Sequence, residues 1–233
     1  IVYSIVLYNG EYTGEEIDGL EFLEFEGGLV EGTDYTVSGN IRTAVGTHTV
    51  TFTGIGNYCD EQTVNFEILP PSVIRDVLDD TITADNVTLD RLDELKLLEE
   101  ALSTINEDTV HDDLEEWKNA AEKLPAIIDA LEELDALVNS EDIKAAEDIN
   151  ADNVTMDDKQ SLEDAKADIV KLLDQYSGNL GAETVEELEQ RLETIEDSLD
   201  ALKAVEDTVA RIEKWLKDNE KKFDADELKL REE

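Results

Sequence analysis

The side chains best suited to acid, base or metal chemistry are few. The 233 residues include two histidines, His48 and His111, and one cysteine, Cys59. Because the histidines lie in segments of different composition, a shared dyad or metal site would need two domains to meet, and we interpret both as packing or surface residues. Among 61 acids, the mere existence of a carboxylate pair carries no information. The sequence therefore nominates no catalytic residue, no cofactor-binding residue and no metal ligand.

Three acidic pairs are candidates for calcium binding: Asp79-Asp80, Asp112-Asp113 and Asp157-Asp158. None has the spacing of a D-x-[DN]-x-[DN]-G loop, so we expect solvated helix faces instead. Gly54-Ile55-Gly56 is not followed by a helical pattern, which indicates a turn rather than a phosphate-binding loop. Trp117 and Trp215 could stack on sugars, but both fall on or beside predicted apolar stripes, so packing is expected.

Composition changes at Pro70-Pro71, which we interpret as a short stiff linker. Ten of the 12 glycines and nine of the 13 aromatic residues precede it, whereas the later part is rich in Ala, Leu, Glu, Asp and Lys. In residues 49–53 and 63–68, apolar and polar residues alternate with period two, as in strands with one buried face. We predict a small antiparallel β-sandwich or roll over residues 1–70, strand-like from IVYSIVLY onward.

The same segment resembles a known family of β-domains. LYNGEYTGEEI, LVEGTDYTVSGN and VGTHTVTFTGIGNYCDEQTVNFEI resemble the MBG-type, immunoglobulin-like repeat of bacterial surface proteins over residues 3–68. The resemblance implies an extracellular, often tandem, noncatalytic module. Cys59-Asp60-Glu61-Gln62 also resembles, in letters, the internal thioester motif of complement-type proteins; because the match covers four residues, we expect an ordinary thiol.

The later part contains an internal repeat. ITADNVTLD at 82–90 recurs as INADNVTMD at 149–157, an offset of 67 residues. Apolar steps of three and four follow each copy, and short helix candidates precede them near 72–81 and 141–149. We predict two three-helix bundles in series, over residues 71–140 and 141–233, with buried stripes that include Val205, Val209 and Ile212.

Local signals refine the helices. Thr88 and Thr155 are placed as N-caps, with Asp90, Asp157 and Asp158 in the first turn, where the helix dipole favours anions. Pro125 removes a helical hydrogen bond, so we expect a bend or break near residues 123–125. The bundles, over about residues 72–217, resemble the FIVAR and albumin-binding GA repeats of Gram-positive surface proteins, which implies a cell-surface setting.

Net charge narrows the function further. A formal charge of -42 excludes a surface that neutralises nucleic-acid phosphates, and no apolar run is long enough to span a membrane. The chain starts without Met, so we expect a fragment of a longer protein. We predict a noncatalytic, elongated, monomeric spacer or adhesion scaffold, extracellular and associated with a bacterial cell wall. The alternatives are a binding module for a host protein or glycan, and an accessory region of a secreted carbohydrate-active enzyme.

Overall fold

The chain combines a small β-sheet region with several helices, which confirms the prediction of a mixed β plus α protein. The computed structural model describes residues 9–22 and 28–232, with side chains to residue 219 except for Phe22. The strand predicted at IVYSIVLY lies outside the described residues for all of its length. The chain divides into two compact units, Ile1–Glu133 and Leu134–Glu233.

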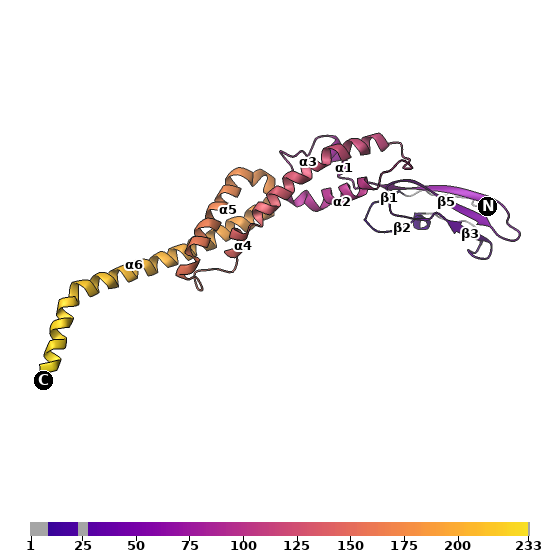
Figure 1. The fold of residues 1–233 in the computed structure, drawn as a ribbon. Coiled ribbons are helices and arrows are strands. Elements are labelled where there is room, and N and C mark those ends of the chain that lie inside the picture. The colour runs from indigo at the N-terminus through magenta and orange to yellow at the C-terminus, as the bar shows by residue number, and fades with distance from the viewer. Residues whose placement is uncertain (1–8, 23–27, 233) are drawn as a thin grey trace. The chain divides into compact units, whose positions relative to one another are not determined.

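Two small sheets form the β region of the first unit (Figure 1). In the larger sheet, β1 (Asn9–Glu11), β6 (Glu61–Leu69), β5 (Gly46–Gly54) and β3 (Tyr35–Ser38) lie side by side in that order. In the smaller one, β2 (Ile17–Asp18) pairs with β4 (Ile41–Arg42). Strands β3, β5 and β6 pair antiparallel as predicted, but β1 runs parallel to β6, so the prediction of an entirely antiparallel region is wrong. The long connection between β1 and β6 does not impose the reversal of direction that a tight turn imposes.

The large sheet buries one face in a core that continues into the helices. Val50, Phe52, Val64, Phe66 and Ile68 are buried, as period-two alternation predicts. The same apolar cluster includes residues of each α-helix described in this unit. Both prolines of Pro70-Pro71 are buried as well, so they belong to this packed unit and are not an exposed linker.

Backbone hydrogen bonds also join the sheet to the helices. The Thr47 N–H donates to the Val110 carbonyl over 2.7 Å, and the Val45 N–H donates to the Thr104 hydroxyl over 3.1 Å. Gly46, with φ of 128°, lies between these contacts, and a Cβ there would approach the Thr109 methyl group to 3.2 Å. Glycine is therefore required where β5 meets the loop before the third helix.

The helices described in the first unit are α1 (Ile74–Leu78), α2 (Leu92–Ser103), preceded by a 3-10 turn at Leu89–Arg91, and most of α3 (Leu114–Val138), whose end from Leu134 onward belongs to the second unit. A further 3-10 turn covers Gly19–Phe22. Helix α3 continues through Pro125, so the break expected near residues 123–125 is wrong, whereas the bend expected as its alternative stays a prediction. Proline in a helix interior costs about 3 kcal/mol, but Leu124, Ile127 and Ile128 are buried on both sides of it, and each such side chain contributes roughly 1.5–3 kcal/mol. Burial outweighs the lost hydrogen bond.

The second unit contains α4 (Glu141–Ala145), a 3-10 turn at Met156–Asp158, α5 (Lys159–Leu180) and α6 (Ala182–Glu232). Helices α5 and α6 are joined by the single residue Gly181, whose φ of 80° suits glycine, and they pack along each other (Figure 1). Helix α4 starts 67 positions after α1, and α5 starts 67 positions after α2. The 3-10 turn at Met156–Asp158 likewise starts 67 positions after the turn at Leu89–Arg91. The sequence duplication is therefore also a duplication of structural elements.

Candidate functional site

The repeated ADNVT segment forms the same loop in both copies. The Asn86 side chain accepts a hydrogen bond from the Thr83 N–H and donates one to the Thr81 carbonyl. The Asn153 side chain accepts from the Asn150 N–H and donates to the Asp148 carbonyl, both over 2.8 Å. The asparagine is thus explained by loop closure, in which its amide serves as donor and acceptor at once. These bonds assign the motif a structural role.

The two caps that follow the loops differ. Thr88 and Thr155 both occupy the predicted N-cap positions, with extended backbones. The Thr155 N–H and hydroxyl both donate to the Asp158 carboxylate, and these bonds lower the pKa of Asp158. The position of Asp158 is taken in the first copy by Arg91, which binds Asp76 and Glu94, each over 2.8 Å. The start of α5 is therefore stabilised by the carboxylate of Asp158, whereas the start of α2 is stabilised by the guanidinium group of Arg91.

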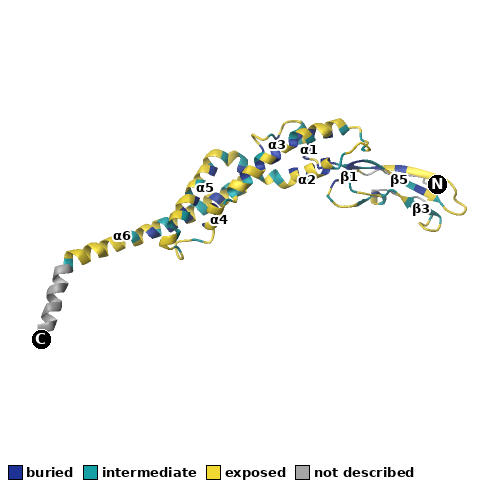
Figure 2. Cartoon of the chain, viewed as in Figure 1, coloured by how far each residue is buried: buried dark blue, intermediate teal, exposed yellow. Residues whose placement is uncertain are grey.

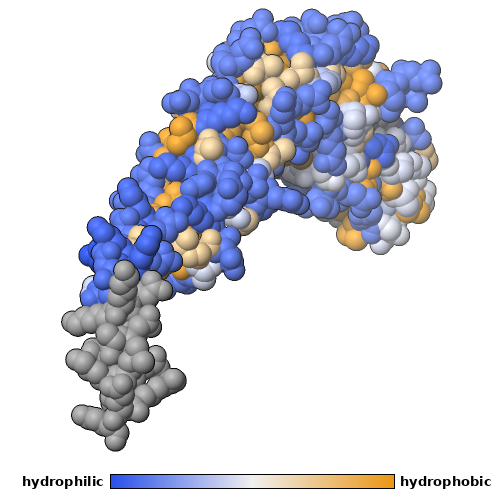
Figure 3. Space-filling view, turned by 60° about the vertical axis from the view of Figure 1, so that its left-hand side comes forward, coloured by the Kyte–Doolittle hydropathy of each residue, from blue (hydrophilic) through white to orange (hydrophobic). Residues whose placement is uncertain are grey.

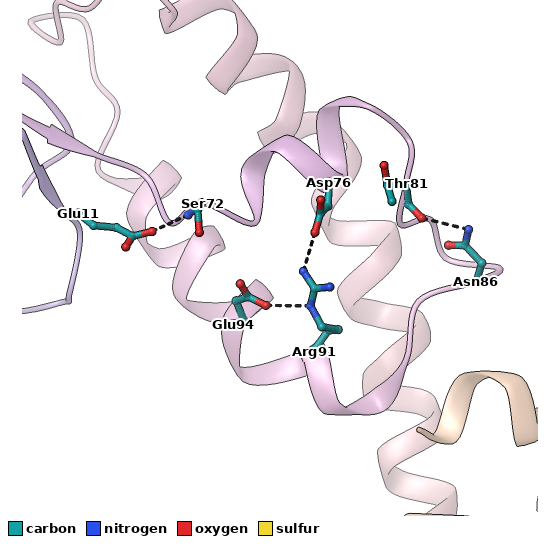
Figure 4. A network of polar contacts seen from close by, with 7 residues as sticks. All are labelled: Glu11, Ser72, Asp76, Thr81, Asn86, Arg91 and Glu94. Carbon is teal, nitrogen blue, oxygen red and sulfur yellow. Dashed lines mark hydrogen bonds and ion pairs between the residues drawn. The ribbon is translucent and has the colours of Figure 1, made fainter. Parts of the chain in front are cut away.

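Figure 4 shows the polar contacts around α1 of the first unit. Arg91 lies between Asp76 of α1 and Glu94 of α2, and the hydrogen bond to Asp76 raises the pKa of Arg91. The Glu11 carboxylate of β1 accepts a hydrogen bond from the Ser72 N–H over 2.5 Å. These contacts connect the edge of the sheet, the proline segment and two helices, and each charged group in them has a structural partner.

The two histidines pack on different aromatic rings. The His48 ring lies 5.4 Å from that of Phe66, and its Nε2 lies 2.6 Å from the Ala44 carbonyl oxygen; burial lowers the pKa of His48. His111 stacks on Trp117 at 4.1 Å between ring centroids. The hydrogen bond between Thr47 and Val110 brings the two backbones together, but each ring is engaged by its own neighbour. Packing roles are confirmed for both histidines and for the buried Trp117.

One residue of each acidic pair makes a contact that the structure describes. Asp80 has a φ of 53°, and its carboxylate forms an ion pair with Lys123 at 2.7 Å. The Lys123 ammonium group also donates hydrogen bonds to the carbonyls of Val77 and Leu78 at the end of α1. The Asp113 N–H donates to Nδ1 of His111. Among the described residues, no group of three or more His, Cys, Asp or Glu side chains is arranged to hold a metal ion.

Cys59 is exposed and lies in the turn between β5 and β6. Gly54 ends β5 and Gly56 lies in the turn that follows, and a Cβ on Gly54 would meet the Tyr58 carbonyl oxygen at 2.3 Å. The tight approach requires glycine and confirms the turn interpretation. The ordinary-thiol assignment of Cys59 stays a prediction.

A cleft of about 340 Å³ opens beside β1. Its lining includes the apolar residues Leu69, Pro70, Ile74 and Trp117, together with the charged residues Arg75, Glu11, Asp113 and Glu116. That volume is at the small end for a ligand pocket. Among the described side chains, no buried polar atom lacks a hydrogen-bond partner. Sequence patterns gave no signal for it, because its walls come from segments far apart in the chain.

An exposed apolar stripe on α6 is the second candidate. Trp215 is 54% exposed, so the expectation that it packs in a core is wrong. Val205, Val209, Ile212 and Leu216 are also exposed, and the burial predicted for the first three is wrong too. Figure 2 shows exposed positions prevailing along α6 toward its C-terminal end. We call Val205, Val209, Ile212 and Leu216 the α6 stripe.

Comparisons with known proteins add no identity. A scan against models of protein families, a search of curated proteins and a search of solved structures each found no match. No helix of the described residues has the length and apolarity needed to cross a membrane. The resemblances to MBG, FIVAR and GA repeats stay predictions.

Proposed function

We propose that this chain is a noncatalytic, modular spacer or adhesion scaffold of a bacterial cell surface or secreted protein. In this proposal an MBG-like β-domain is followed by two three-helix bundles in series, in a monomer associated with the cell wall. The extracellular setting is supported by the sequence resemblance of residues 3–68 and 72–217 to surface repeats. The proposal involves no cofactor.

The observation that carries the scaffold proposal is the duplicated loop. Asn86 and Asn153 make matching donor and acceptor bonds 67 residues apart, and the helices after them start 67 residues apart. Repetition of one supersecondary unit extends a protein by adding copies, each of which contacts its neighbours. Such construction suits a spacer, because length is obtained without a new site in each copy.

A distance measurement tests the spacer. Spin labels on Cys59, which is exposed, and on Gly178→Cys would report on the separation of the two units. Apart from its chain neighbours and the backbone of its own helix, Gly178 has no atom within 4 Å of its ideal Cβ position, so a labelled side chain fits there. A spacer predicts one narrow distance distribution in double electron–electron resonance.

The control places both labels in the second unit, at Gly178→Cys and Asp200→Cys, in a Cys59→Ser background. This pair must give a narrow distribution whether or not the chain is a spacer. A broad distribution for the pair in different units, with a narrow one for the control, would contradict the spacer proposal.

A second candidate function is a binding module for a host protein or glycan. The specific observation that favours it is the exposure of Trp215 and of the α6 stripe, since a contiguous apolar surface marks an interaction site more often than scattered apolar residues do. The charged residues beside the α6 stripe indicate which class of partner would bind it.

A further inference from the structure

The α6 stripe continues a seam that α5 already covers. Leu188, Ile195 and Leu202 follow one another at intervals of seven and are at most 3% exposed beside α5. The same interval leads to Val209 and Leu216, where exposure rises to 48% and 50%. Apolar residues repeating every seven positions form the seam of helices that pack along each other. One helix surface is thus covered over its first part and uncovered over its second.

The residues between these positions give the uncovered part the apolar pattern of a helix-pairing surface. With Leu188 at heptad position a, position d is Arg191 and Ser198 in the covered part but Val205 and Ile212 in the uncovered part. Apolar residues at both a and d are the pattern of a two-helix seam. The cations of the segment are at positions b, c and f, on the outer face: Lys203, Arg211, Lys214 and Lys217.

Two glutamates lie beside the seam, and one of them already forms an ion pair with a residue of α5. At position e are Glu206 and, one heptad later, Glu213. Glu206 accepts a 2.7 Å ion pair from Lys159, the first residue of α5, and this bond raises the pKa of Lys159. Glu213 has no ion-pair partner among the described side chains. If another helix packed on the uncovered part of α6 as α5 packs on the covered part, a cation of that helix would lie at Glu213, as Lys159 lies at Glu206.

We propose that the α6 stripe binds a basic amphipathic helix of a partner protein, with a lysine or arginine of that helix at Glu213. The inference deepens the second candidate function and leaves the spacer proposal standing if it fails. Continuity with the seam between α5 and α6 identifies the partner as a helix, and Glu213 identifies its flank as basic. A chain of charge -42 also attracts a basic helix over long range.

A second copy of this chain fits the stripe less well. Two copies of charge -42 repel each other, and an antiparallel pairing of two α6 stripes would bring Glu206 of one close to Glu213 of the other. Figure 3 shows hydrophilic residues over most of the visible helical surface, with hydrophobic residues in separate patches. The charge of this surface opposes association of two copies in general.

The test uses the full chain and two designed probe peptides of four heptads, each with Leu at a and d. One has Lys at e and g, and the other has Glu there. We expect the Lys peptide to bind at least about tenfold more tightly, measured by fluorescence anisotropy of the labelled peptide. Equal binding, or no binding, of the two peptides would overturn the proposal.

Matched variants separate the seam from general attraction to an acidic protein. Ile212→Asp adds a carboxylate within the stripe, and Ala210→Asp adds the same charge at position b. We expect the first to weaken Lys-peptide binding by about tenfold or more, because it buries an unpaired carboxylate, and the second to leave binding unchanged. Both positions are exposed, so circular dichroism should show folded variants. Equal binding by both variants would place the peptide elsewhere and overturn the proposal.

Sedimentation velocity of the chain alone tests the other occupant. We expect a single species whose mass does not change with concentration. A dimer that forms with rising concentration and is abolished by Ile212→Asp would show that a second copy covers the stripe. That result would overturn the proposal and the monomeric state proposed above, but not the spacer role.

Discussion

Asn86 and Asn153 hold their loops with the same two kinds of side-chain bond, in segments of nearly identical sequence. The sequence predicted the N-caps at Thr88 and Thr155, but no role was predicted for the two asparagines. It did not reveal what the asparagine does. A donor and acceptor in one side chain is visible in the sequence, but the carbonyl and N–H that it joins depend on how the loop closes.

Removal of the Asn153 amide should loosen the start of α5. We expect Asn153→Ala to destabilise the loop by about 1–2 kcal/mol, because two hydrogen bonds are lost and each contributes about 0.5–1.5 kcal/mol net. Native-state hydrogen exchange of the α5 amides would measure this locally. Asp152→Ala is the matched control, since the neighbouring exposed carboxylate should be dispensable; equal effects of the two substitutions would contradict the assigned role.

At the scale of elements, the apolar periodicity and the capping residues predicted where most helices start. Tertiary packing determined which apolar positions are buried and how the strands pair. The duplication predicted the short helices before each loop, and α1 and α4 lie within the expected ranges. Periodicity shows which side of a helix is apolar but not whether a neighbour is present, so Val205, Val209 and Ile212 were wrongly expected to be buried. Alternation likewise assigns the faces of a strand but not its direction, which is why the parallel pairing of β1 was missed.

Pro125 offers a test of how burial overrides local propensity. Its side chain is exposed while its neighbours Leu124 and Ile128 are buried, so the proline contributes strain without core contacts. Pro125→Ala should stabilise the first unit by about 1–3 kcal/mol, because an N–H donor and a favourable helix former are restored. Urea unfolding followed by circular dichroism would measure it. The control Ala126→Pro, at the adjacent exposed position, should destabilise the unit; no gain from Pro125→Ala would show that α3 is already relaxed around the proline.

At the scale of the whole molecule, charge is the property that sequence predicts most directly. Sixty-one acids against 19 Lys and Arg leave most carboxylates without a cation to pair with, wherever the fold places them. Surface ion pairs such as Lys96 with Glu132 and Lys166 with Glu196 are each worth about 0–1 kcal/mol. They cannot offset the repulsion among the remaining acids, so the folded chain carries an unfavourable electrostatic free energy at low salt.

Salt should therefore stabilise the protein, because the Debye length falls from about 30 Å at 0.01 M to about 10 Å at 0.1 M and the mutual repulsion of the acids is screened. We expect the midpoint of thermal unfolding to rise with sodium chloride. Calcium and magnesium at matched ionic strength should give similar increases, since no metal-holding group is found among the described residues. A saturable increase at low concentration for calcium alone would instead indicate a carboxylate site that binds the folded state. Thermal melts in the three salts distinguish diffuse screening from such a site.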